Sequence, residues 1–257
     1  MAMSGGGGGI GELLKTTLAD GLMTFLFVFC VSTLGPLTSL ILASPLYDSL
    51  ITFLKSVTPP PNLIVTTLIL FVFLLILTTI ASLLGGASFN PTSTIAFHTA
   101  GFKPNSLISM SLRFPAQALG AVAGAVSITS LMPVPYNQML PGPRLKVDMH
   151  IGGFAECVLT FLVCFGILWI VTRGPNNPVF KVAMISLTTV TLVISGSKYT
   201  GPAMNPANAY AWAYVNNHHN TWEHLYVYWM CPFIGSILAA WVFRFIFPPP
   251  PTKTKKA

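Results

Sequence analysis

The sequence has little charge. Only 7% of its residues are Asp, Glu, Lys or Arg, whereas 53% are hydrophobic. This balance excludes a water-soluble globular domain and is typical of a chain that lies in lipid. The charges that remain are mostly basic, thirteen Lys and Arg against six Asp and Glu. These basic residues form no stripe with interleaved aromatic residues, so nucleic acid is not the expected partner.

Cysteine is also sparse. The four cysteines lie inside apolar runs, and none of them has the Cys-x-x-Cys or Cys/His spacing of a metal site or a disulfide framework. The sequence therefore predicts free, buried thiols, no metal and no cofactor. It also lacks a cluster of acids, bases or metal ligands at one depth, which a membrane enzyme would need, so we expect no catalytic residues.

Long hydrophobic runs are what the sequence does contain. A bilayer core of roughly 30 Å is crossed by about 20 apolar residues in a helix. Six runs reach this length, the fifth being the shortest, and loops rich in Pro and Gly separate them. The predicted spans are residues 13–34, 63–84, 106–131, 151–171, 179–195 and 225–247.

Two further segments, 90–101 and 205–215, have a helical pattern but only about three turns, too short to cross a bilayer. We interpret them as re-entrant half-helices. An even number of spans places both termini on one side. That side carries nine basic residues, Arg113 counted among them, and the opposite side four. The positive-inside rule then predicts cytosolic termini.

The chain repeats itself. Residues 19–29 align with 155–165, with matching Ala, Thr, Phe and Leu positions and an acid second in each segment, Asp20 and Glu156. Because each copy holds three spans, the second copy enters the membrane in the opposite orientation. The predicted fold is an all-α membrane protein with two inverted repeats, approximately 12–131 and 149–247, within one domain of residues 1–257. A basic tail, 248–257, follows.

Each half-helix begins with an Asn-Pro motif, Asn90-Pro91-Thr92 in the first repeat and Asn205-Pro206-Ala207 in the second. Proline at the first helical position loses no hydrogen bond, and the preceding Asn is a good N-cap. The positive ends of the two helix dipoles would meet at the bilayer centre, where they repel cations. The Asn amides would bind the oxygen of a passing neutral molecule.

Asp20 and Glu156 lie within hydrophobic helices, where an ionised side chain is costly and normally has a partner. Our hypothesis is that each carboxylate braces a re-entrant loop through backbone N–H groups. The alternative is a proton relay. A carrier also uses inverted repeats and broken helices. Coupling to ions usually requires charged residues in the membrane near the substrate, and only these two acids qualify, so the sequence favours a channel.

With the twin Asn-Pro motifs and the paired acid-x3-Thr-Phe helices, the chain resembles the aquaporin or major intrinsic protein family over nearly its whole length. Its basic composition, the Thr in the first motif and Asn208 after the second are similar to the first subgroup of plant small basic intrinsic proteins. That resemblance implies a water channel of the endoplasmic reticulum membrane, in which four separately conducting copies associate.

The resemblance also shows where this chain departs from the family. Most members have an arginine where Asn208 stands, so a fixed positive charge is missing from the outer constriction. The other constriction positions, carried over by spacing, are Leu70, Val193 and Pro202. This apolar ring leaves other small neutral solutes, such as hydrogen peroxide or glycerol, open as alternatives to water. A third alternative is that the protein conducts poorly and serves as an assembly partner.

The chain ends in Lys253-Thr254-Lys255-Lys256-Ala257. Lys253 and Lys255 match a dilysine retrieval signal on a cytosolic tail, which a receptor reads as an address. The alternative is a solvated basic tail that obeys the positive-inside rule. The family resemblance favours retrieval.

Overall fold

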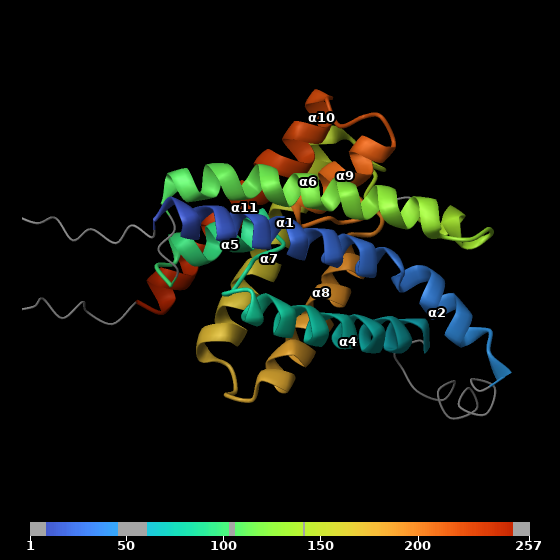
Figure 1. Cartoon of the computed structure of the whole chain (residues 1–257), viewed down its shortest axis with the longest axis horizontal. Helices are drawn as coiled ribbons and strands as arrows, with labels where there is room; N and C mark the ends of the chain where they lie inside the picture. The colour runs from blue at the N-terminus through green and yellow to red at the C-terminus, as the bar shows by residue number, and fades with distance from the viewer. Residues whose placement is uncertain (1–8, 46–60, 103–105, 141, 249–257) are drawn as a thin grey trace, which may run out of the picture.

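The computed structural model describes residues 9–45, 61–102, 106–140 and 142–248. Every element of regular structure in these ranges is a helix (Figure 1). Six helical runs in this part of the chain are long and apolar enough to cross a membrane, and the fifth is the shortest. The predicted all-α membrane fold is confirmed.

The six runs lie close to their predicted positions, with one exception. The first run continues from α1 (Ile10–Ser32) into α2 (Leu34–Leu42). The others are α4 (Pro61–Leu83), α6 (Leu107–Leu131), α7 (Met149–Arg173), α8 (Pro178–Gly196) and the joined run of α10 (Trp222–Leu225), the π-helical η2 (Tyr226–Met230) and α11 (Cys231–Ile246). A short 3-10 helix, η1 (Tyr136–Met139), lies between α6 and α7.

The first span is longer than predicted. We expected it to end at residue 34, but the joined run of α1 and α2 extends to Leu42. Thr33, between the two helices, keeps a helical backbone conformation, and its hydroxyl donates to the Cys30 carbonyl. Pro36 lacks an amide hydrogen, which interrupts the hydrogen-bond ladder there without ending the span. Leu34, the last residue of the predicted span, and Gly35, in the extra turns, both line a central cavity.

Two short helices occupy the predicted re-entrant positions, α5 (Pro91–Thr99) and α9 (Pro206–Val215). At about 1.5 Å per residue they reach about 13–15 Å, half of a bilayer core. Each packs mainly against helices of the other repeat: α5 against α11 and α7, and α9 against α6. The two halves of the chain are therefore tied together by their half-helices.

Glycines allow the long helices to approach closely. α1 packs along α6, and α7 packs along α11. A Cβ at Gly120 of α6 would collide with the backbone carbonyl of Gly21 in α1, and a Cβ at Gly235 of α11 would collide with that of Cys157 in α7. Small residues at such crossings are the usual means of helix packing in lipid, because they let backbones come into van der Waals contact.

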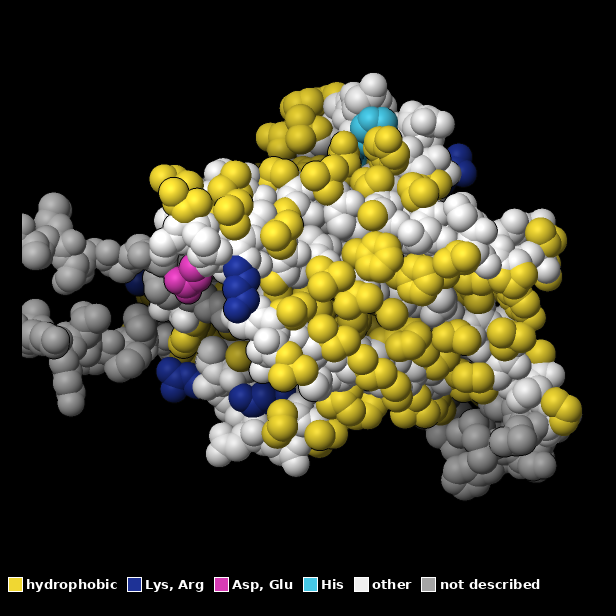
Figure 2. Space-filling model, in the orientation of Figure 1, with side chains coloured by type: hydrophobic (Ala, Val, Ile, Leu, Met, Phe, Trp, Pro, Cys, Tyr) yellow, Lys and Arg dark blue, Asp and Glu magenta, His cyan; other side chains and the backbone are white. Residues whose placement is uncertain are grey.

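The outer surface is apolar around its middle. Figure 2 shows hydrophobic side chains covering most of the visible face, with lysine and arginine side chains gathered towards one end. Leu18, Leu68 and Leu119 are each more than half exposed. A continuous apolar patch of this size is unusual on a soluble protein and suits contact with lipid chains. The described chain begins in α1 and ends in α11 at the same end of the molecule (Figure 1).

Candidate functional site

The two Asn-Pro motifs begin their half-helices as the sequence predicts. Asn90 and Asn205 both have extended backbones, and a proline follows each at the first helical position. The Asn90 side-chain oxygen accepts a hydrogen bond from the Thr92 amide at 2.9 Å, and that of Asn205 accepts one from the Ala207 amide at 3.1 Å. Each asparagine is thus the N-cap of its own helix.

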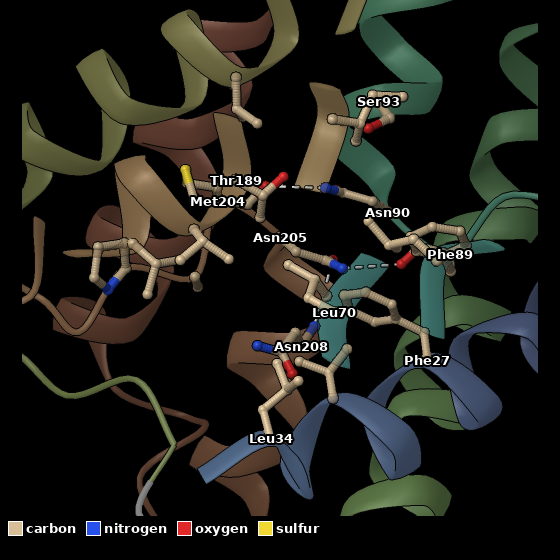
Figure 3. A pocket seen from close by; sticks show the side chains of 18 of the residues that line it. Phe27, Leu34, Leu70, Phe89, Asn90, Ser93, Thr189, Met204, Asn205 and Asn208 are labelled. Carbon is tan, nitrogen blue, oxygen red and sulfur yellow. Dashed lines mark hydrogen bonds between the residues drawn. The ribbon is translucent and has the colours of Figure 1, made fainter. Parts of the chain in front are cut away.

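The same two side chains also bind across to the opposite motif. The Asn90 amide nitrogen donates to the Met204 carbonyl at 3.0 Å, and the Asn205 amide nitrogen donates to the Phe89 carbonyl at 2.9 Å (Figure 3). Each acceptor immediately precedes the other asparagine. The half-helices therefore meet head to head, with their positive dipole ends at one point.

Thr92 adds a contact that its counterpart Ala207 cannot make. Its hydroxyl is fully buried and lies 3.0 Å from the Met204 carbonyl oxygen and 2.8 Å from the Asn90 side-chain oxygen. The sequence suggested only that a larger residue alters packing here. In the structure the extra volume carries a polar link between the two half-helices.

Asp20 is completely buried and holds the first re-entrant loop. It accepts the Ser88 amide hydrogen at 2.8 Å. It also accepts from Gln117 at 2.7 Å and forms a two-point ion pair with Arg113, at 2.6 Å to Nε and 3.0 Å to Nη2. Arg113 is therefore wrongly placed among the cytosolic loop cations: it is a buried α6 residue whose charge is paired inside the protein.

Glu156 is equally buried but has a different set of partners. It accepts from the Thr200 hydroxyl at 2.8 Å and from the amides of Ala203 and Met204 at 3.0 and 3.1 Å. Ser88 and Ala203 each stand two residues before an asparagine. Both carboxylates thus hold the loop of their own repeat at the same place, which is the bracing geometry our hypothesis requires.

A cavity of about 690 Å³ runs past the two motifs. Asn90 and Asn205 line it, and so do all four residues predicted for the constriction, Leu70, Val193, Pro202 and Asn208. Sequence reasoning missed Phe27 and Leu34, which also line it (Figure 3). Phe27 stacks on Phe89 with ring centroids 4.6 Å apart. The signal for Phe27 was its place in the repeated helix, whereas nothing local showed that Leu34, the last residue of the predicted first span, faces the cavity.

The remaining predicted residues are the two tail lysines and the four cysteines. Lys253 and Lys255 lie outside the described residues. The four cysteines are free thiols, but only Cys164 and Cys231 are buried as predicted, whereas Cys30 and Cys157 are partly exposed.

The family model for the major intrinsic protein matches residues 11–243. The chain belongs to the major intrinsic protein family, and it is therefore a multi-pass membrane channel for water or small solutes rather than an enzyme.

Within the family, the similarity is to the first subgroup of small basic intrinsic proteins. Aquaporin SIP1-2 of Zea mays is 52% identical over 250 residues, covering 96% of this chain and 99% of that protein. Aquaporin SIP1-1 of Oryza sativa subsp. japonica is 51% identical over 245 residues, covering 94% and 96%. The resemblance drawn from the motifs is confirmed.

The fold also matches a solved structure. The aquaglyceroporin from Plasmodium falciparum superposes with a TM-score of 0.68 at 18% identity, covering 92% of this chain and 98% of that one. At this identity the likeness concerns the fold, and the residues that line the pore are this chain's own.

Proposed function

We propose that the chain is a passive water channel in which the head-to-head pair of Asn90 and Asn205 is the polar point of an otherwise apolar pore. The observation that carries the proposal is the crossed pair of hydrogen bonds to Met204 and Phe89. Each amide uses one N–H in that bond, and its second N–H remains to donate to the oxygen of a passing molecule. Both asparagines line the cavity.

The experiment is stopped-flow swelling of proteoliposomes that contain the full-length protein. Water permeability should exceed that of protein-free liposomes, rise linearly with the osmotic gradient and be independent of added ions. A saturating or ion-dependent flux would favour a carrier. Permeability equal to that of empty liposomes would overturn the proposal and leave the reading of a non-conducting assembly partner.

Other small neutral solutes are the second candidate, and the constriction residues support it. Leu70, Val193 and Pro202 are apolar, and Asn208 carries no charge. Such a ring lacks the fixed cation and the rigid donors that select strictly for water. Hydrogen peroxide and glycerol belong in the same stopped-flow series.

The proposed location is the endoplasmic reticulum membrane, with both termini cytosolic and four copies associated as separate pores. With Arg113 buried in its ion pair, the count of basic residues on the terminal side falls to eight, still twice the four opposite. The similar proteins from Oryza sativa and Zea mays are named aquaporins, which supports the channel function. The proposed unit is one domain with inverted repeats at approximately 12–131 and 149–247.

The retrieval signal has its own test. Replacing Lys253 and Lys255 with alanine together should release the protein from the endoplasmic reticulum to later membranes, as seen by fluorescence microscopy of a tagged chain. If the location of the double variant is unchanged, the two lysines are not a retrieval signal, and the basic tail only follows the positive-inside rule.

A further inference from the structure

The two asparagines present hydrogen-bond donors to the cavity, and the two carbonyls beside them are already engaged. The free N–H groups of Asn90 and Asn205 both donate. The Met204 carbonyl already lies within hydrogen-bonding distance of two donors, Asn90 and Thr92. The Phe89 carbonyl already accepts from Asn205. A solute that passes this point finds donors for its oxygen atom. Its own hydrogens can be received by the Ser93 hydroxyl of α5, which lines the cavity, or by a hydroxyl on the facing wall.

The wall formed by α4 and α8 is mostly apolar where it faces the cavity. Leucine, isoleucine and valine side chains predominate, and three threonines stand among them. Two of these threonines are already engaged. The Thr66 hydroxyl is paired with Thr38 at 3.0 Å, and the Thr78 hydroxyl donates to the Leu74 carbonyl at 2.6 Å.

The third, Thr189 of α8, differs. It lines the cavity (Figure 3), and within the described ranges its hydroxyl makes no hydrogen bond. Its neighbour Thr188 shows the usual alternative, since that hydroxyl donates to the Met184 carbonyl one turn back at 2.8 Å. The Thr189 hydroxyl therefore keeps both its donor and its acceptor capacity for the cavity.

Thr189 also lies at the depth of the two motifs. At about 1.5 Å per residue it is about 16 Å from the start of α8 at Pro178, close to the middle of a bilayer core. Independently, the next residue, Val190, belongs to the apolar cluster against which Phe89 packs, and Phe89 directly precedes Asn90.

We propose that Thr189 is a specificity-determining residue. Together with the free amide hydrogens of Asn90 and Asn205, it forms a mid-membrane subsite for small neutral solutes. These solutes accept a hydrogen bond through one oxygen atom and donate a hydrogen bond from a second oxygen atom. Hydrogen peroxide is the smallest such molecule. One of its oxygens accepts from the asparagines while the hydroxyl on the other donates to Thr189. Water accepts and donates through the same oxygen and therefore spans a shorter distance between the asparagines and Thr189, so we expect the subsite to favour the peroxide relative to water.

The inference rests on the proposed channel function and is tested on the full-length protein in proteoliposomes. Water permeability is measured by stopped-flow light scattering, and hydrogen peroxide entry is measured with an entrapped peroxide-sensitive dye. The variants are Thr189→Val, which keeps the shape and removes the hydroxyl, and Thr189→Ser, which keeps the hydroxyl. Thr188→Val is the matched control, because Thr188 does not line the cavity.

Thr189→Val should lower the ratio of peroxide to water permeability by about fivefold, the size expected for one lost hydrogen bond. Thr189→Ser and Thr188→Val should keep the ratio of peroxide to water permeability within about twofold of the parent value, because neither change removes a full hydrogen bond to the solute. An unchanged ratio in Thr189→Val, or an equal loss in Thr188→Val, overturns the inference while the channel function stands. A parent protein that conducts neither molecule above empty liposomes overturns both.

Discussion

At the scale of single residues, the two buried acids each hold a re-entrant loop, but their electrostatic environments differ. Asp20 faces a full positive charge on Arg113 as well as the Ser88 amide. Glu156 is held by a hydroxyl and two backbone amides. The first site is therefore an ion pair within the membrane region, and the second is a carboxylate bound by dipoles. This difference predicts that the two acids respond unequally to neutralisation.

Asp20→Asn should destabilise the protein by about 3–5 kcal/mol, because it removes the carboxylate that forms the ion pair with the buried Arg113. Glu156→Gln should cost about 1–3 kcal/mol, because the amide nitrogen of glutamine meets one backbone N–H and loses that bond. The detergent-purified variants are heated, and thermal unfolding is measured as the fraction of protein that still elutes as a single peak in size-exclusion chromatography.

A double variant provides the control. Asp20→Asn combined with Arg113→Met removes both members of the ion pair and should recover part of the lost stability. The prediction is wrong if Glu156→Gln is as damaging as Asp20→Asn. Water flux lost in a stably folded Glu156→Gln protein would instead revive the proton-relay reading of these acids.

Asn208 stands in the proposed constriction at the position where the family resemblance implies an arginine. Asn208→Arg should reduce glycerol and hydrogen peroxide permeability several-fold while water permeability stays within about twofold, because a long cation narrows the opening and adds fixed donors. Asn208→Gln is the neutral control of intermediate length. Stopped-flow assays with the three solutes give the comparison, and equal effects of the two variants would exclude a role for charge.

At the scale of elements, the contacts between long helices depend on glycine. Gly120 in α6 faces the backbone of Gly21 in α1 so closely that no Cβ fits between them. The backbone cannot yield as a flexible side chain would. The pairing of α1 with α6 therefore tolerates no added atom at this crossing.

Gly120→Ala should lower the thermal unfolding temperature markedly, by an overpacking cost of about 1–3 kcal/mol or more. Gly11→Ala, near the start of α1, is the matched control, because nothing lies within 4 Å of its added Cβ. That variant should be neutral or slightly stabilising, since alanine is the better helix former. Similar unfolding temperatures for the two variants would contradict the packing assigned to this crossing.

At the scale of the whole molecule, six spans bring the first and last described helices to one end (Figure 1). From the distribution of basic residues we propose that this end faces the cytosol. In sealed microsomes, protease added outside should remove a tag fused to the C-terminus. A tag inserted in η1, Tyr136–Met139, should be protected because it lies on the other side. The reverse pattern would invert the proposed topology.

The sequence by itself determined the elements that follow from local chemistry. Apolar length set the spans, and proline after asparagine set where both half-helices begin. The repeated acid position pointed to the loops that Asp20 and Glu156 hold. These features were predictable because each depends on neighbouring residues or on the cost of a charge in lipid.

Only the tertiary structure decided which distant side chains meet. The sequence placed Arg113 with the loop cations, because nothing local shows that it faces Asp20. It included Leu34 in the first span without showing that this residue faces the cavity, and it left Thr189 as one helical threonine among many. The crossed packing of α5 and α9 against the opposite repeat brings these residues around one pore, and such convergence is set by helix packing across the whole chain.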